Sequence, residues 1–115
     1  MPFSEKDKVP DERQALGKKG EKIAEKFLKR KGYKVLQRNY RCSLGEIDLI
    51  AVDGDYLVFV EVKTRSEVGS ILPQHAVDWR KQRRLARLAA YFLSSNPRMK
   101  TQPPCRFDVV AISTN

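Results

Sequence analysis

The sequence is poor in the residues that build disulfide frameworks and zinc sites, with two cysteines and one histidine among 115 residues. Cys42 and Cys105 are too few and too widely separated for a disulfide framework. Together with His75, the single histidine, they do not supply the four ligands that a structural zinc ion takes. Both thiols are therefore interpreted as incidental groups of a protein in a reducing compartment.

Long apolar runs are also missing. Stretches such as Leu57–Val60 are far too short to cross a bilayer. The N-terminal residues are charged and lack the apolar segment of a secretory signal. The expectation is a cytoplasmic protein without a membrane partner.

Acidic residues are outnumbered, because 14 aspartates and glutamates stand against 23 lysines and arginines, for a net charge of +9. This excess favours a polyanionic partner, nucleic acid before an anionic membrane. It does not separate an enzyme from a structural RNA-binding protein, since both share the composition. A chain of 115 residues with 41% hydrophobic residues is long enough for one domain with one core.

The chain is predicted to consist of a flexible arm over residues 1–13 and a single domain over residues 14–115. Apolar residues at helical spacing predict one helix over 14–31 and another that begins near Pro73 or Asp78 and ends near Ser94. Strands are predicted over 33–38, over 106–112 and in a hairpin within 45–65, with a connector over 39–44 and a loop over 66–73. The order α-β-β-β-α-β favours an α/β fold with a mixed β-sheet flanked by helices, whose last strand is central or well covered.

The hairpin within Gly45–Arg65 carries the most informative pattern. A turn at Asp53-Gly54 between two apolar runs is a strong hairpin signal, and it sets Asp48 opposite Phe59. Side chains alternate along a strand, so four charged groups are predicted to project on one side: Glu46, Asp48, Glu61 and Lys63. Acids on strands this apolar are costly to bury unless they are paired or bind a cation.

Carboxylates on neighbouring strands are suitable ligands for Mg²⁺ or Mn²⁺. Asp48 and Glu61 are the predicted metal ligands, with the backbone carbonyl of Val62 as a third. Lys63 is expected near a metal-bound water, where it helps to deprotonate that water or neutralises charge as phosphorus is attacked. The alternative is a buried salt-bridge network of the four charged groups, but three acids against one lysine leave it incomplete without a cation.

Two charged residues outside the hairpin admit two interpretations each. Glu21 lies at the edge of the apolar face of the first helix, where it reaches inward or remains a surface acid among lysines. Lys81 falls in line with the apolar residues of the second helix, where it snorkels to solvent or points at the acids or a phosphate. The sequence leaves open the roles of four further residues: Glu46, Trp79, Tyr91 and Asp108.

The opposite side of the second helix is basic. It carries a cluster of arginines with no acid between them: Arg80, Arg83, Arg84 and Arg87. Such a cluster favours contact with phosphates over a merely solvated helix face.

The segments GEIDLI and VFVEVKTR resemble the core motif of the PD-(D/E)XK nuclease superfamily, with Ile47 where that motif has a proline. The resemblance covers nearly the whole chain and extends to the uncharacterised bacterial YraN-like family, which is similar to archaeal Holliday-junction resolvases. The further segments that carry it are Gly17-x-x-Gly20-Glu21-x-x-Ala24, Gly32-Tyr33, Arg38-Asn39-Tyr40, Ala76-Val77 with Lys81, and Arg106–Val110.

This resemblance implies a restriction-endonuclease-like fold, metal binding by Asp48 and Glu61, a catalytic Lys63, and Glu21 as the acid that completes the site. The activity it implies is a Mg²⁺-dependent endonuclease that hydrolyses phosphodiester bonds of DNA, including branched structures. Resolvases act as two-fold dimers, so a homodimer is also expected. The alternative is a non-catalytic nucleic-acid-binding module of the same fold. The expected nucleic-acid contacts are Arg65, Arg80, Lys81, Arg83, Arg84 and Arg87.

Overall fold

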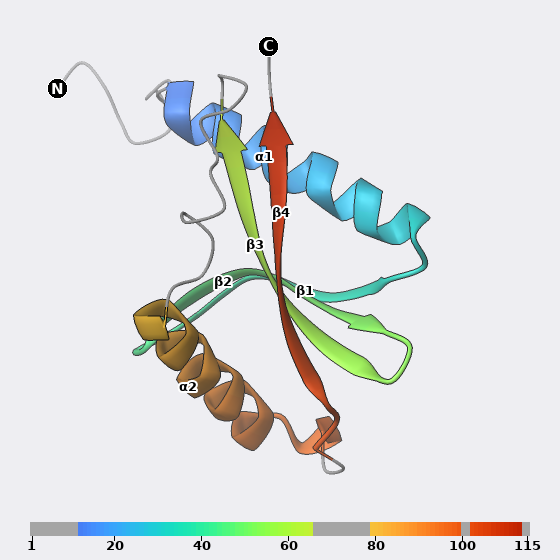
Figure 1. Cartoon of the computed structure of the whole chain (residues 1–115), viewed down its shortest axis with the longest axis vertical. Helices are drawn as coiled ribbons and strands as arrows, with labels where there is room; N and C mark the ends of the chain where they lie inside the picture. The colour runs from blue at the N-terminus through green and yellow to red at the C-terminus, as the bar shows by residue number, and fades with distance from the viewer. Residues whose placement is uncertain (1–11, 66–78, 100–101, 114–115) are drawn as a thin grey trace, which may run out of the picture.

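The computed structural model describes residues 12–65, 79–99 and 102–113 (Figure 1). The predicted order α-β-β-β-α-β is confirmed. The elements are α1 (Glu12–Arg30), β1 (Lys34–Cys42), β2 (Gly45–Asp53), β3 (Tyr56–Arg65), α2 (Trp79–Ser95), the 3-10 helix η3 (Pro97–Met99) and β4 (Cys105–Ser113). The predicted loop over 66–73, and the predicted arm up to residue 11, lie outside the described residues. In the described part, no helix is long and apolar enough to cross a bilayer.

The four strands form one mixed sheet in the order β1-β2-β3-β4. The pairs β1–β2 and β2–β3 are antiparallel, whereas β3–β4 is parallel. The last strand was expected to be central or well covered; β4 is an edge strand of this sheet, so it is not central. Its apolar composition has another cause, because Phe107 packs on one face of the sheet and Val110 and Ile112 pack on the other. The restriction-endonuclease-like arrangement, a mixed sheet between helices, is the one expected from the sequence.

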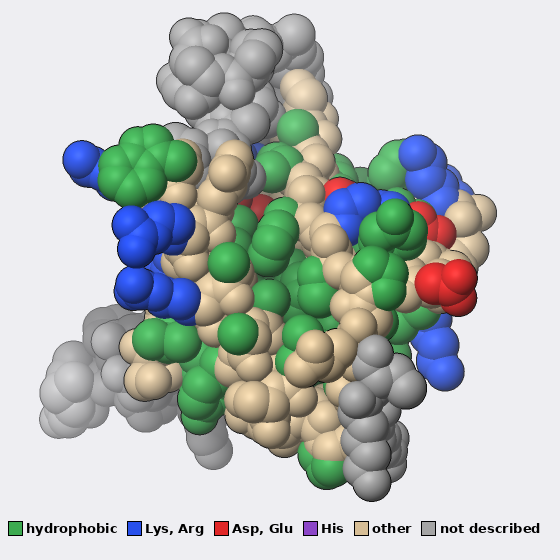
Figure 2. Space-filling view, turned by 60° about the horizontal axis from the view of Figure 1, so that its bottom comes forward, with side chains coloured by type: hydrophobic (Ala, Val, Ile, Leu, Met, Phe, Trp, Pro, Cys, Tyr) green, Lys and Arg blue, Asp and Glu red, His purple; other side chains and the backbone are tan. Residues whose placement is uncertain are grey.

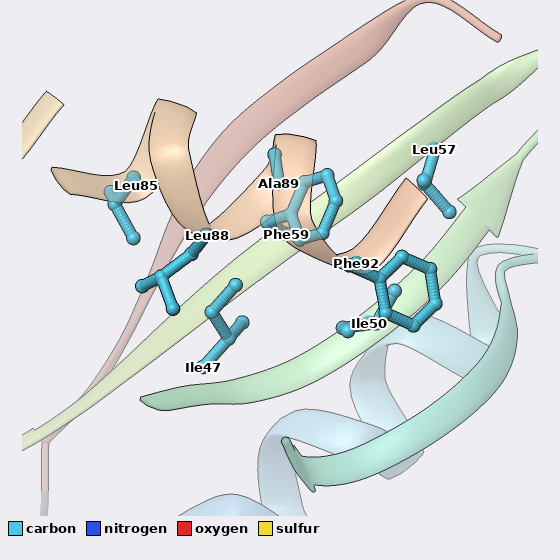
Figure 3. Close-up of a cluster of buried hydrophobic side chains, with 8 residues drawn as sticks. All are labelled: Ile47, Ile50, Leu57, Phe59, Leu85, Leu88, Ala89 and Phe92. Carbon is cyan, nitrogen blue, oxygen red and sulfur yellow. The ribbon is translucent and has the colours of Figure 1, made fainter. Parts of the chain in front are cut away.

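The two α-helices cover opposite faces of the sheet (Figure 1). Side chains alternate along β3, so Leu57 and Phe59 face α2 while Val58 and Val60 face α1. Figure 3 shows the α2 side of the core, where the helix lays four side chains over β2 and β3: Leu85, Leu88, Ala89 and Phe92. One apolar layer on each face thus holds β2 and β3 between α1 and α2.

The strand β1 is longer than predicted. The sequence predicts a connector over 39–44, but Tyr40 pairs with Ile47 and Cys42 pairs with Gly45 of β2. Asn39 has a φ of +51°, which asparagine tolerates better than most residues. The prediction failed because β1 is an edge strand with one polar side, and only Tyr40 and Cys42 reach the apolar cluster under α2.

The turn between β2 and β3 lies one residue later than predicted. Asp53 pairs with Tyr56, so the two turn residues are Gly54 and Asp55, and Ile50 rather than Asp48 is opposite Phe59. Gly54 has a φ of +59°, and a type II′ turn requires a positive φ at its first central position, which glycine adopts freely. The sequence signal was correct for a hairpin but wrong for its register.

The helix α1 approaches β3 closely at Gly20. A Cβ atom at this position would collide with Thr64 Oγ1 and lie 3.1 Å from Thr64 Cβ. Because threonine branches at Cβ, rotation of its side chain does not clear this space. A glycine therefore allows α1 to lie against β3, and this close packing helps to fix the adjoining residue, Glu21.

Candidate active site

A cavity of about 170 Å³ lies beneath α2 at the ends of β2 and β3. One water takes up about 30 Å³ in the liquid, so several waters fit. The described residues that line this acidic cavity are Glu46, Ile47 and Asp48 of β2, Phe59, Val60 and Glu61 of β3, Lys81, Arg84 and Leu85 of α2, and Phe107 and Asp108 of β4. Figure 3 shows the apolar part of this wall, where Ile47, Phe59 and Leu85 come from three different elements.

Asp48 lies just beyond the paired part of β2 and β3. The ladder runs from Asp53–Tyr56 to Leu49–Val60, and past it the Val62 N–H donates a hydrogen bond of 2.7 Å to Asp48 Oδ2. Burial raises the pKa of the Asp48 carboxyl, and the negative charges of Glu61 and Glu46 raise it further, against the lowering effect of the Val62 N–H. A cation in the cavity would favour the ionised form of Asp48.

Glu61 projects from β3 towards α2, on the same side as Phe59. Its Oε1 atom forms an ion pair with the Lys81 ammonium. Its Oε2 atom is buried and has no hydrogen-bond partner among the described residues. An ionised oxygen in this state is costly to bury, so it marks a position that a cation or a water can occupy.

Glu21 lies on α1 near Asp48, but it lines a separate hollow with Asn39 and Leu49 and is not among the described residues that line the acidic cavity. Burial raises the pKa of its carboxyl, the charge of Asp48 raises it further, and a hydrogen bond with the Asn39 side chain lowers it. Glu21 is half-buried, so it is not the fully solvated surface acid that one interpretation predicted. The sequence analysis gave no role to Asn39, although the residue belongs to the Arg38-Asn39-Tyr40 segment that carries the family resemblance.

The structure brings Lys81 to the acids, where it pairs with Glu61. Its charge also lowers the pKa of Asp48, so it acts on both carboxylates. Of the two interpretations of Lys81, contact with the acids is confirmed. Lys63 follows Glu61 by two residues on β3 and is not among the described residues that line the cavity. The sequence also predicts the Val62 carbonyl as a ligand, and the contact seen at Val62 is its N–H donating to Asp48.

A shallow basic groove lies on the outer side of α2. It is lined by Ser43 and Leu44 of the β1–β2 turn together with Trp79, Arg80, Arg83, Arg84 and Arg87 of the helix. All four arginines are exposed, and Figure 2 shows basic side chains gathered along this edge of the molecule, at the left of the view. Arg84 lines both the groove and the acidic cavity, so the two adjoin. The predicted contact Arg65 has a side chain outside the described part.

Trp79 and Tyr91 are both exposed, so neither belongs to the core. The Trp79 ring lies in the basic groove with the Arg80 guanidinium 5.3 Å from its centre. This arrangement of an exposed aromatic ring among arginines is suited to contact with a nucleic-acid base.

Asp108 takes part in an ion-pair network. Arg106 Nε donates to Asp108 Oδ1 at 3.0 Å, and Arg106 Nη2 donates to Asp53 Oδ2 at 3.1 Å and to the Tyr33 hydroxyl at 2.6 Å. These bonds tie β4 to the end of the β2–β3 hairpin. The carboxylate of Asp108 is therefore engaged by Arg106, which favours a structural role.

The chemistry of the cavity fits a hydrated Mg²⁺ or Mn²⁺ ion. Within residues 12–65, 79–99 and 102–113, no three aspartate, glutamate, histidine or cysteine side chains are grouped closely enough to enclose a metal. Mg²⁺ does not need such a cage, because one or two carboxylates usually bind it while waters and substrate phosphates complete its shell. Asp48 and the unbonded Oε2 of Glu61 supply two carboxylates, and the cavity has room for the waters.

Comparisons with known proteins identify the family of this chain. The model of uncharacterised protein family UPF0102 matches residues 20–112. A UPF0102 protein of Moorella thermoacetica is 51% identical over 100 residues, 87% of this chain and 82% of the relative. One from Symbiobacterium thermophilum is 52% identical over 98 residues, 84% of this chain and 80% of the relative. One from Caldanaerobacter subterraneus is 44% identical over 103 residues, 90% of this chain and 83% of the relative. The chain belongs to the uncharacterised protein family UPF0102, the YraN-like family of nuclease fold.

Proposed function

We propose that this chain is a divalent-metal-dependent endonuclease that hydrolyses phosphodiester bonds of DNA at the acidic cavity. The observation that supports this most is the meeting of Asp48 and Glu61 in one cavity, with Glu61 Oε2 buried and bonded by no described residue. The raised pKa of Asp48 supports it as well, because the fold holds this carboxylate in surroundings that disfavour its charge. Functional sites are where such costs are typically found.

Each residue of the site has a role in this proposal. Asp48 and Glu61 hold the metal, with the Val62 carbonyl as an additional ligand, and the Val62 N–H fixes the Asp48 carboxylate. Glu21 adds negative charge from α1 beside Asp48. Lys63 supplies a positive charge on the Glu61 side of β3, where charge develops on the phosphate oxygens. When bound, Mg²⁺ or Mn²⁺ lowers the pKa of a coordinated water and neutralises phosphate charge.

The basic groove is the proposed path of the nucleic acid. Its arginines are exposed and are expected to contact phosphates. Phosphate contacts position the nucleic-acid backbone but do not read its sequence. Arg84 lines both the groove and the acidic cavity. It could therefore contact a phosphate at the point where the nucleic acid passes from the groove to the cavity. Branched DNA is the substrate class that the resemblance to resolvases suggests, and a homodimer would present two such sites.

A second candidate is a binding module that does not cleave. The observation in its favour is the ion pair between Lys81 and Glu61, because it neutralises one of the two acids without a metal. The unbonded Glu61 Oε2 argues against it, and so does the pKa of Asp48, which stays raised although the Val62 N–H and the charge of Lys81 lower it.

Cleavage of labelled four-way junction, flap, duplex and single-stranded DNA distinguishes these functions. Each substrate is incubated with Mg²⁺, Mn²⁺ or EDTA and with the wild-type, Asp48→Asn and Lys63→Ala proteins. Metal-dependent cleavage by the wild type, lost by more than about 100-fold in both variants, supports the nuclease. If no substrate is cleaved but all three proteins bind DNA with a steep salt dependence, the binding module is correct.

A further inference from the structure

The Lys81 side chain points into the acidic cavity rather than out into solvent. Its ammonium is paired with Glu61 Oε1, and the side chains of Lys81 and Glu61 are 23% and 27% exposed. The residue lies in the first turn of α2 as the structure describes it, a turn that contains no acid. A helix N-terminus disfavours a cation, and the ion pair with Glu61 offsets part of this cost.

One lysine does not balance the charge of the cavity. Lys81 contacts one oxygen of Glu61, and the other oxygen is buried without a partner among the described residues. The charge of Lys81 stabilises the ionised form of Asp48 only in part, since the pKa of Asp48 is still raised. A divalent cation shared by Asp48 and Glu61 would match two negative charges and weaken the attraction between Glu61 and the Lys81 ammonium.

We propose that Lys81 is an exchangeable counter-ion that links metal binding to phosphate binding; this inference rests on the proposed function. Without metal, the ammonium neutralises Glu61. When a divalent cation binds to Asp48 and Glu61, the flexible lysine side chain leaves Glu61 and contacts a phosphate of the nucleic acid. Arg84 lines the same cavity and groove, so the released ammonium joins an existing basic surface.

Such an exchange has two opposite consequences for a variant without the ammonium. Lys81 competes with the metal for Glu61, so Lys81→Met is expected to bind Mn²⁺ more tightly than the wild type in the absence of nucleic acid. The ammonium also carries the coupling, so the gain in DNA affinity that metal produces is expected to be smaller in the variant. Coupling between two ligands is typically about 5-fold to 150-fold and is equal in both directions.

Arg87→Met is the matched control. It removes one positive charge from the same helix, and Arg87 lines the basic groove but is not among the described residues of the acidic cavity. It is expected to weaken DNA binding by a similar factor with and without metal, and to leave the affinity for Mn²⁺ unchanged.

The experiment combines two measurements on folded proteins. Isothermal titration calorimetry gives the affinity for Mn²⁺ of the wild type, Lys81→Met, Arg87→Met and Asp48→Asn. Fluorescence anisotropy gives the affinity for a labelled four-way junction in EDTA and in Ca²⁺, a second divalent ion with oxygen ligands. The exchange predicts that Lys81→Met binds Mn²⁺ at least about 5-fold more tightly and loses most of the metal-dependent gain in DNA affinity.

The outcomes separate this inference from the proposed function. If the wild type binds Mn²⁺ through Asp48 but Lys81→Met has unchanged Mn²⁺ affinity, the exchange is overturned and the nuclease stands. If neither protein binds Mn²⁺, both are overturned. Should Lys81→Met fail to fold, Glu61→Gln provides the second readout. It releases Lys81 without metal and is expected to bind DNA more tightly in EDTA than Asp48→Asn, which removes the same charge; equal affinities overturn the exchange.

Discussion

The Val62 N–H donates its hydrogen bond to the side chain of Asp48 at 2.7 Å, just past the last pair of the β2–β3 ladder. One carboxylate oxygen thus accepts from a backbone donor of β3 at the point where its ladder with β2 has ended. The bond also fixes the direction of the carboxylate, which lines the acidic cavity beside Glu61. The Asp48 carboxylate therefore has two roles, because the group that accepts from the Val62 N–H is also a proposed metal ligand.

Asp48→Asn is expected to stabilise the metal-free fold at neutral pH. The ordinary pKa of Asp48 is 3.8, and the folded protein raises it mainly through burial. The folded state therefore holds the proton more tightly, and stability falls as pH rises from about 4 through the raised pKa. Asparagine keeps an oxygen for the Val62 N–H but has no charge. Urea unfolding should show a gain for the variant at pH 7.5 that vanishes near pH 3.5.

Glu25→Gln is the control with the opposite sign. A hydrogen bond from Arg38, 3.0 Å long, lowers the pKa of Glu25, so its charge stabilises the fold above the ordinary value of 4.5. This variant should be less stable at pH 7.5, and the difference should shrink as pH falls through the lowered pKa. An Asp48→Asn protein that is less stable than the wild type at pH 7.5 would contradict the interpretation of Asp48.

Glu21→Gln should reduce metal affinity and cleavage by roughly 10-fold to 100-fold, as expected when a residue beside a metal site is changed. The reason is its position, since Glu21 is half-buried and the charge of Asp48 raises the pKa of its carboxyl after burial does. Glu46→Gln is the matched comparison: its side chain is 61% exposed and pairs with Arg41 at 3.1 Å. Calorimetric titration with Mn²⁺ should show a larger loss for Glu21→Gln. Equal effects would mean that Glu21 acts only through bulk charge.

Gly20→Ala should destabilise the fold by about 1–3 kcal/mol through overpacking against Thr64. In an ordinary helix position the same change stabilises by up to about 1 kcal/mol, so the sign of the effect reports the close approach. Combining Gly20→Ala with Thr64→Ala should recover part of the loss, as measured by a double-mutant cycle in urea. Additive effects of the two changes would show that α1 and β3 do not touch there.

Trp79→Ala and Arg83→Ala should weaken nucleic-acid binding in different ways. Trp79 is 61% exposed in the basic groove, and stacking of one base on an aromatic ring is worth about 1–3 kcal/mol. Its loss should affect single-stranded and branched DNA more than duplex, with an unchanged salt slope. Arg83→Ala should weaken all three and reduce the salt slope by about one. Anisotropy titrations at several salt concentrations measure both; identical behaviour of the variants would contradict base stacking.

Much of the fold was predictable because its signals are local. The helical spacing of Leu85, Leu88 and Phe92 and the alternation along β3 follow from burial on one side of each element. The register of the hairpin could not be predicted, because Asp53-Gly54 and Gly54-Asp55 are both acceptable turns. The choice depends on which apolar side chains reach α1 and α2, and this is decided by packing across the sheet.

The two strand acids were predictable as site candidates, whereas the contact of Lys81 with Glu61 was only one of two interpretations of that lysine. Asp48 and Glu61 stand out because acids are rare on apolar strands. Lys81 is twenty residues from Glu61, so their contact depends on where α2 crosses the sheet. The same holds for Asn39 and Glu21, which meet through the packing of α1 against the sheet. Sequence patterns reveal the chemistry on one strand, whereas contacts between elements require the fold.

Whether Asp48 and Glu61 hold one divalent cation together is tested most directly by anomalous X-ray diffraction from crystals soaked in Mn²⁺. The prediction is a single anomalous peak in the acidic cavity, within bonding distance of both carboxylates. The same soak of Asp48→Asn crystals should lack the peak. A wild-type cavity that stays without a peak at saturating Mn²⁺, with Lys81 still on Glu61, would contradict metal binding at this site.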